Sequence, residues 1–93
     1  MEREEAVELL QSNHTFPGPF QFRVVVRPPA AAGTVTAMVA AAGPGALATD
    51  VSERLSKKGT YVALHVTIEV ESAERVLDVY DILGQMEDVL AKL

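Results

Sequence analysis

The most regular alternation of hydrophobic and polar residues in the chain runs from Thr60 to Val70. One set of positions is aliphatic throughout, and the interleaved set is mostly polar. The aliphatic set is Val62, Leu64, Val66, Ile68 and Val70, and the interleaved set is Tyr61, Ala63, His65, Thr67 and Glu69. Because successive side chains of a strand point to opposite faces of a sheet, this period of two predicts a long central strand with one buried face.

Two further segments have the pattern of strands. Phe20–Arg27 alternates between apolar and mostly polar positions, and two prolines end it. Its apolar set is Phe20, Phe22, Val24 and Val26, and its second set is Gln21, Arg23, Val25 and Arg27. Thr49–Ser56 has the mixed polarity that is typical of an edge strand, and a polar turn over Lys57–Gly59 follows it. In this strand we expect one face to carry Val51 and Leu55 and the other to carry Asp50, Ser52, Arg54 and Ser56.

Helical spacing marks the remaining segments. Glu2–Gln11 predicts a short helix with acidic residues in its first turn. Within the Ala- and Gly-rich stretch Ala30–Ala48, an apolar stripe predicts a helix that ends at Gly43, and a flexible linker is the alternative. The stripe consists of Val35, Met38, Val39 and Ala42. Ser72 is a predicted N-cap for a last helix, whose C-cap we place at Gly84. The stripe of this last helix is Ala73, Val76, Val79, Tyr80 and Leu83.

The order of these elements defines a fold class. A short helix precedes β-α-β-β-α-β, where the tail Asp88–Leu93 is a final strand or a terminal flap. Right-handed crossovers favour a ferredoxin-like α+β sandwich, with an antiparallel four-stranded sheet, the first and third strands central, and two helices on one face. We therefore predict an N-terminal appendage over residues 1–15 and a single ferredoxin-like domain over residues 16–93.

Charge and composition limit the functions that are open to such a domain. The 93 residues include 8 Lys and Arg against 13 Asp and Glu, for a net charge of −5. This balance argues against nucleic acid as a partner. The absence of cysteine excludes disulfides and thiol catalysis. Because the N-terminal segment is acidic and no long apolar run or lipidation motif follows, we expect no membrane association and a cytoplasmic location.

No pattern of catalytic or metal-ligating residues stands out. The two histidines, His14 and His65, lie far apart in the sequence and have no companion ligands at metal-site spacing. No serine has the surroundings of a nucleophile elbow, and no glycine-rich phosphate loop opens a helix. RNA-recognition domains share the topology but stack bases on aromatic residues, and Tyr61 is the one aromatic residue expected on the exposed sheet face. We therefore predict no enzymatic activity and no cofactor.

Three sequence pieces resemble the YbeD-like family of small bacterial proteins. They are Phe16-Pro17-Gly18-Pro19-Phe20-Gln21-Phe22-Arg23, Ser56-Lys57-Lys58-Gly59-Thr60-Tyr61, and the closing helix from Val79-Tyr80 to Leu83-Gly84. The resemblance covers about Leu9 to Leu93. It implies a β-α-β-β-α-β fold similar to the ACT-type regulatory domain of D-3-phosphoglycerate dehydrogenase, and a regulatory or accessory role. The stretch Ala30–Ala48 departs from the family, whose first helix is usually longer and more charged.

The exposed face of the predicted sheet is the main candidate for a binding surface. It carries Arg23, Arg27, Tyr61, His65 and Glu69, and we expect the two arginines to border the other three residues. A solvated sheet face is the simpler interpretation. The alternative hypothesis is that an unknown protein partner with an acidic surface docks there. The polar edge strand Thr49–Ser56 also predicts a homodimer.

A small-molecule sensor is the other functional hypothesis. The resemblance to ACT-type domains implies a ligand beside the first strand-to-helix loop, which is Arg27–Thr34 in this chain. In that loop Arg27 offers a guanidinium group for a carboxylate, Gly33 allows close backbone approach, and Thr34 adds a hydroxyl group. The amino-acid-like ligand that this hypothesis implies would bind at these three residues.

Overall fold

The computed structural model describes residues 2–93. Within these residues the chain forms three α-helices, one short 3-10 helix and four strands. In chain order the elements are α1 (Arg3–Asn13), β1 (Gly18–Val26), the 3-10 helix η1 (Pro28–Ala30), α2 (Ala31–Ala42), β2 (Leu47–Leu55), β3 (Val62–Val70), α3 (Ala73–Gln85) and β4 (Val89–Lys92). The tail of the chain is therefore a strand, as one of the two sequence alternatives states.

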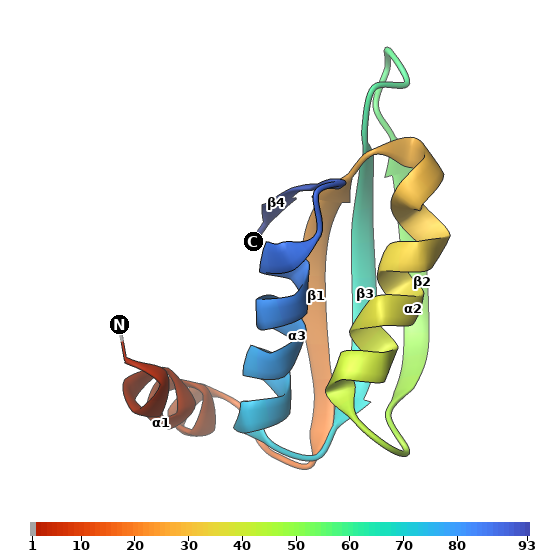
Figure 1. Cartoon of the computed structure of the whole chain (residues 1–93). Coiled ribbons are helices and arrows are strands. Elements are labelled where there is room, and N and C mark those ends of the chain that lie inside the picture. The colour runs from red at the N-terminus through yellow and green to blue at the C-terminus, as the bar shows by residue number, and fades with distance from the viewer. Residues whose placement is uncertain (1) are drawn as a thin grey trace.

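The strands form one antiparallel sheet in the order β2-β3-β1-β4. The predicted α+β class and four-stranded antiparallel sheet are confirmed, with β1 and β3 at the centre and β2 at an edge. Helices α2 and α3 cover one face of the sheet, and α1 lies beside α3, away from the strands (Figure 1). The opposite face of the sheet therefore has no helix over it among residues 2–93.

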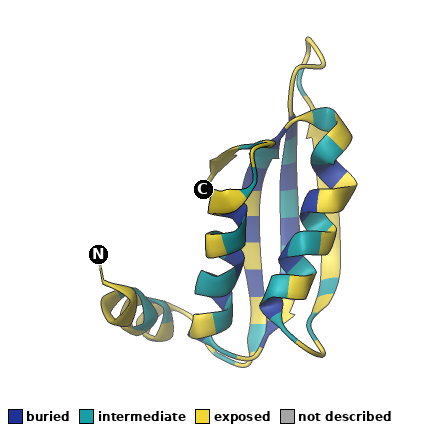
Figure 2. Ribbon diagram, in the orientation of Figure 1, coloured by how far each residue is buried: buried dark blue, intermediate teal, exposed yellow. Residues whose placement is uncertain are grey.

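The core lies between the sheet and the two covering helices. Every second residue of β1 and β3 is buried, and these residues form the dark bands on the two central strands (Figure 2). The predicted apolar sets of β1, β3 and α3 supply much of this core, including the buried residues Phe22, Val24, Leu64, Val66, Ile68, Val76, Val79 and Leu83. Tyr80 is only half-buried, and its ring packs edge-on against Phe22 with centroids 5.4 Å apart.

The ends of the helices follow from local chemistry. Ser72 Oγ accepts a hydrogen bond from the Arg75 amide at 3.4 Å, so the predicted N-cap of α3 is confirmed. Helix α2 ends at Ala42 because Gly43 adopts φ +104°, which L side chains rarely adopt. The stretch that could have been a linker is therefore helical over Ala31–Ala42, and its last residues belong to β2.

The predicted C-cap at Gly84 is wrong. Gly84 lies inside α3, which continues to Gln85 before Met86 turns to extended geometry. A Cβ at this position would lie 3.0 Å from Lys92 Nζ, the far end of a flexible side chain, so position 84 lies close to Lys92. Lys92 crosses the helix here and donates a hydrogen bond to the Tyr80 carbonyl at 3.0 Å.

Helix α1 is held to the body of the protein by two kinds of contact. Arg3 forms salt bridges of 2.7 Å with Asp78 and 2.9 Å with Asp81 on α3. Its guanidinium group also donates to the Glu74 carbonyl at 3.3 Å. No residue of α1 is fully buried, although Leu10 packs partly against the core. The salt bridges of Arg3 and the partial packing of Leu10 therefore both join this helix to the rest of the protein.

Candidate functional site

The uncovered face of the sheet, which we call the open face, contains the sequence-predicted partner site. It comprises the strand positions that alternate with the buried ones on β1, β2 and β3. These positions are Gln21, Arg23, Val25, Asp50, Ser52, Arg54, Ala63, His65, Thr67 and Glu69. Because directly paired residues share a face, the strand register decides which of these side chains are neighbours.

One row of the open face joins three polar side chains. Arg23 of β1 lies directly opposite His65 of β3, and His65 lies opposite Ser52 of β2. Directly opposed side chains have Cβ atoms about 5 Å apart, so Arg23 and His65 are close neighbours. The predicted proximity of these two residues is confirmed.

Glu69 does not border the arginines, which corrects the predicted grouping. It lies opposite Pro19 on one side and Leu47 on the other, at the far end of β3. Four residues of strand separate it from His65, or about 13 Å at the usual rise per residue. The Glu69 carboxylate is therefore too far from Arg23 to neutralise its charge.

Arg27 is also separated from the predicted group. Its Nη1 donates to the Glu87 carbonyl at 2.8 Å and lies 3.5 Å from Asp88 Oδ1. The side chain is thereby drawn to the loop that precedes β4. Tyr61, which is 44% exposed, marks the opposite end of the open face at the β2–β3 turn. The structure therefore brings Arg23 and His65 together, and it distributes Arg27, Tyr61 and Glu69 around them.

The residues of the predicted sensor site do not converge on a ligand position. The expected loop Arg27–Thr34 is instead η1 followed by the first turn of α2, because Pro28 and Pro29 have backbone angles that suit a helix start. Thr34 is fully buried, and its Oγ1 donates to the Ala30 carbonyl at 2.8 Å. Gly33 is an exposed helical residue at which a Cβ would meet nothing within 4 Å.

The basic residues fall into two groups, those with an ionic or hydrogen-bonded partner among the described residues and those without one, and the sequence alone did not indicate this. Within residues 2–93, salt bridges engage Arg3, Arg27 and Arg75, and Lys92 donates to a backbone carbonyl. In the same range no salt bridge engages the other four basic residues, which we call the unpaired cations: Arg23, Arg54, Lys57 and Lys58. All four lie on the open face or at the turn between β2 and β3.

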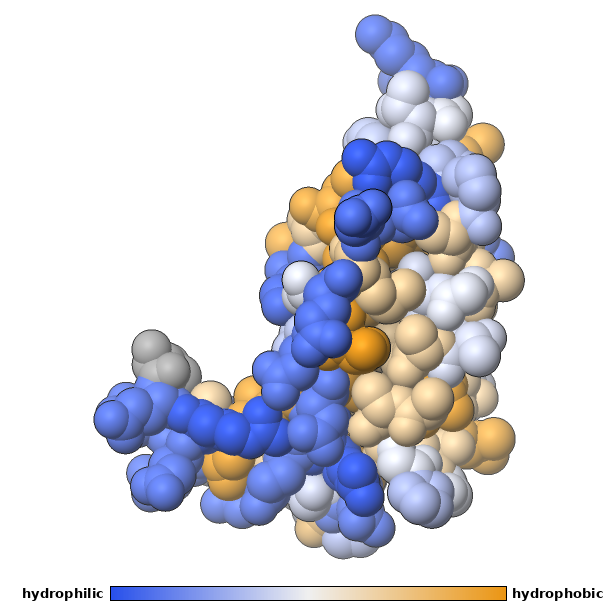
Figure 3. Space-filling view, viewed as in Figure 1, coloured by the Kyte–Doolittle hydropathy of each residue, from blue (hydrophilic) through white to orange (hydrophobic). Residues whose placement is uncertain are grey.

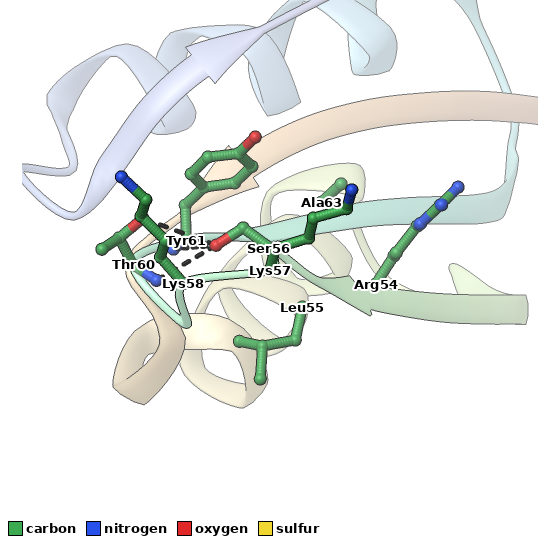
Figure 4. A pocket seen from close by; sticks show the side chains of 8 residues that line it. All are labelled: Arg54, Leu55, Ser56, Lys57, Lys58, Thr60, Tyr61 and Ala63. Carbon is green, nitrogen blue, oxygen red and sulfur yellow. Dashed lines mark hydrogen bonds between the residues drawn. The ribbon is translucent and has the colours of Figure 1, made fainter.

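Three of the unpaired cations surround a concavity of about 530 Å³, which we call the hairpin pocket. Its lining includes Arg54, Ser56, Lys57, Lys58, Tyr61 and Ala63 (Figure 4). From the sequence alone, Lys57–Gly59 is predicted only as a polar turn. Three basic residues within positions 54–58 of an acidic chain are the signal that could have indicated this pocket.

Hydrogen bonds to one hydroxyl group brace the rim of the hairpin pocket. Ser56 Oγ accepts from the amide of Thr60 at 3.0 Å and from the amide of Tyr61 at 3.2 Å (Figure 4). The predicted turn is confirmed, with Gly59 at φ +71° and its amide donating to the Ser56 carbonyl at 2.9 Å. The backbone beneath the lysines is therefore fixed by the fold.

The described part of the chain, residues 2–93, contains no group of three or more His, Asp or Glu residues that could hold a metal ion. None of the helices in this range has the length and apolar character needed to cross a membrane. Every buried side-chain polar atom in the range has a hydrogen-bond partner.

The comparisons with known proteins place this chain in a family. The protein is a small α+β protein with one open sheet face, and the family model described as "Protein of unknown function (DUF493)" matches residues 11–93. The chain belongs to this family, which is also the family of YbeD, so the resemblance found in the sequence is confirmed. The searches of curated proteins and of solved structures returned no match.

Proposed function

We propose that this protein is a non-catalytic regulatory or adaptor protein of ferredoxin-like, ACT-like fold, which works by docking another protein on its open face. The strand order β2-β3-β1-β4 and the placement of α2 and α3 on one face support the ferredoxin-like part of this proposal. Such an arrangement leaves the other sheet face accessible to a partner.

The distribution of the unpaired cations is the observation that carries the proposal. The chain has more acidic than basic residues, yet within residues 2–93 the side chains of four basic residues form neither a salt bridge nor a hydrogen bond. They lie on one surface, while the basic residues near the helices and β4 form salt bridges or, for Lys92, a hydrogen bond to a backbone carbonyl. Arg23 and Arg54 supply guanidinium groups, which pair carboxylates in a two-pronged geometry. The arrangement suits a partner that presents carboxylates.

The apolar part of the open face supports a protein partner. Tyr61 is 44% exposed, and Leu47, at the other end of the sheet, is 63% exposed. Aromatic and arginine side chains are enriched among the residues that dominate protein–protein binding. The face also carries Asp50 and Glu69, which oppose the approach of a polyanion such as nucleic acid.

Affinity capture with open-face variants tests the proposal. Wild-type protein, the Arg23→Glu variant and a Gln11→Glu/Gln85→Glu control are used to retrieve binding proteins from the native cell. The control changes the net charge by the same amount, but at exposed positions on α1 and α3. We expect the wild type and the control to retrieve the same partner and Arg23→Glu to lose it. If all three proteins retrieve it equally, the open face is not the docking surface.

A further inference from the structure

We propose that the hairpin pocket receives an acidic, extended segment of the partner protein, whose carboxylates pair with Arg54, Lys57 and Lys58. This inference rests on the proposed adaptor function, because it assigns the chemistry of the partner at one end of the same open face. It also assigns a binding role to a turn that the sequence alone presents as a solvated connection.

The hairpin pocket concentrates positive charge. Three cations line one concavity, and no carboxylate is among the residues that line it. Without these three positive charges the net charge of −5 would be −8, so the pocket is a cationic site on an otherwise strongly acidic protein. Like charges held close together repel each other, and a carboxylate-bearing ligand relieves that repulsion.

The backbone of the hairpin pocket is also preorganised. Ser56 Oγ holds the amides of Thr60 and Tyr61, and the Ser56 amide donates to the Tyr61 carbonyl at 2.9 Å. These bonds fix the backbone that presents the two lysines before any ligand arrives. A site whose frame is already ordered loses less conformational entropy on binding.

Apolar and aromatic side chains lie beside the cations. Ala63 forms a small apolar floor, and the Tyr61 ring stands at the edge of the pocket, on the side away from Leu55 (Figure 4). An apolar or aromatic residue between the acidic residues of a partner would pack on this ring. Combined charge and aromatic contacts of this kind favour an acidic peptide over a simple inorganic anion.

Positive charge could also indicate RNA, but the observations favour an acidic peptide. Binding of single-stranded RNA relies on stacking of bases on several aromatic side chains. Tyr61 is the one aromatic residue that lines the hairpin pocket. On the same face, Asp50 and Glu69 would lie near an extended phosphate backbone that continued along the strands.

Two other parts of the surface formed by residues 2–93 contain none of the unpaired cations that line the hairpin pocket. On the helix side, the outer surface of α2 is formed by small, uncharged residues and appears in pale orange and white beside the blue, charged residues of α1 and α3 (Figure 3). Nothing in the structure shows what covers it. A groove between α1 and α3 is lined by Glu4, Glu8 and Glu74 together with Arg3, whose guanidinium group is already paired.

A peptide titration tests the assignment. The probe is a fluorescein-labelled heptapeptide with four glutamates around a central tryptophan, and its control has glutamines in place of the glutamates. Binding is measured by fluorescence anisotropy at about 50 mM salt and again at about 500 mM, where charges are strongly screened. Amide chemical shifts of isotope-labelled protein then locate the contact on the chain.

We expect the glutamate peptide to bind the wild type and to shift amides of residues 54–63, and the glutamine peptide not to bind. The Lys57→Gln/Lys58→Gln variant should bind about fivefold more weakly, because each exposed ion pair contributes a modest amount. The Gln11→Glu/Gln85→Glu variant, with the same change in net charge, should bind as the wild type does.

Three results would overturn the inference. They are no saturable binding of the glutamate peptide, undiminished binding to Lys57→Gln/Lys58→Gln, or tighter binding of a single-stranded oligouridine at the same amides. The outcome is separable from that of the proposed function. If the lysine variant still retrieves a cellular partner that Arg23→Glu loses, the hairpin pocket is not the contact point but the open face remains the docking surface.

Discussion

Arg23 and His65 face each other across the two central strands, in a row that continues to Ser52 on β2. Arg23 has no salt bridge among the described residues, and the carboxylate of Glu69 lies at the other end of β3. A cation in the middle of a sheet face, next to a histidine rather than an acid, adds little to the stability of the fold. This position of Arg23 is the basis on which we propose that the open face binds a partner.

The Arg23→Glu variant should therefore fold at least as well as the wild type. The new carboxylate would lie directly opposite His65, and favourable side-chain pairs across neighbouring strands contribute about 0.2–1 kcal/mol. We expect a melting temperature between that of the wild type and about 4 °C above it. Thermal denaturation followed by circular dichroism provides the measurement, and a melting temperature clearly below the wild type would show that Arg23 has a structural role.

The core assignment predicts large losses for truncation on β3. Leu64 and Ile68 are fully buried against the helices. Leu64→Ala or Ile68→Ala should each lower the free energy of unfolding by about 2–5 kcal/mol. Val51→Ala, at a 43% exposed position of the edge strand, is the control and should cost less than about 1 kcal/mol. Denaturant titrations measure all three, and equal losses at Leu64 and Val51 would contradict the placement of the core on the central strand β3 rather than on the edge strand β2.

Local pattern was sufficient for the strands and the central pairing, because a period of two fixes the buried face without knowledge of the neighbours. It was also sufficient for α2, where Met38 and Ala42 are buried as their spacing predicts. It failed at Gly84, where α3 continues to Gln85 although the glycine suggested a helix end. A glycine near a helix end has the same local signal whether it ends the helix or lies inside it.

The candidate site was less predictable for the same physical reason. The partner of Arg27 is Asp88, 61 residues further along the chain, and no local pattern indicates that contact. Which residue of β1 lies opposite Glu69 depends on the register between β1 and β3. In the structure that residue is Pro19, four positions away from Arg23. The hairpin pocket depends on the turn geometry that Ser56 and Gly59 set. The sequence predicted which residues lie on the open face, but it did not predict which of their side chains are neighbours.

The docking of α1 through Arg3 leads to a prediction about its dynamics. The hydrogen bond to Asp78, together with the one to Asp81, raises the pKa of Arg3, and a guanidinium group is charged at any working pH even without them. Arg3→Gln removes both salt bridges and should release α1 from α3. Hydrogen exchange should become faster at the amides of residues 6–13, while the melting temperature changes by no more than about 4 °C. Salt at about 0.5 M should have the same effect on the wild type.

Faster hydrogen exchange of α1 in Arg3→Gln would show that the Arg3 salt bridges hold the helix on α3. The control is Arg75→Gln, which removes the salt bridges of Arg75 with Glu71 and Asp78 but leaves Arg3 and both of its carboxylate partners in place. If α1 exchanges at the same rate in the wild type and in Arg3→Gln, contacts of Leu10 hold the helix in place instead.

Burial of Tyr80 predicts an effect on alkaline unfolding. Loss of solvent around the hydroxyl group raises the pKa of Tyr80 above its usual value, so the folded state keeps this proton more tightly than the unfolded state does. The stability that this provides is complete below the unfolded value of about 10 and is lost as the pH rises through the folded pKa. Tyr80→Phe should therefore lose less stability than the wild type between about pH 9 and pH 12.

The matched control for this effect is Tyr61→Phe, at the exposed ring of the hairpin pocket. Denaturant midpoints at a series of alkaline pH values provide the comparison. Tyr61→Phe should follow the wild-type curve. A Tyr80→Phe curve that also coincides with the wild type would contradict the role assigned to burial of the Tyr80 hydroxyl group.

The edge strand β2 predicts self-association. Its outer backbone groups have no strand partner within residues 2–93, and Val51 and Leu55 are 43% and 60% exposed. Free edges with apolar side chains readily pair with another strand. We expect a concentration-dependent homodimer in light scattering, and we expect Val51→Lys to abolish it. Leu90→Lys, on the other edge strand, is the control, and a monomer at high micromolar concentration would remove the dimer from this account.

The most direct test of the central claim is a photo-crosslinking comparison between the two faces. A benzophenone amino acid is placed at Ser52, in the central row of the open face, and separately at Thr36, which is exposed on α2. After irradiation in the native cell, adducts are identified by mass spectrometry. We predict a discrete protein adduct at Ser52 that disappears when Arg23→Glu is added, and no such adduct at Thr36. A discrete adduct at Thr36 with none at Ser52 would contradict the claim that the open face is the docking surface.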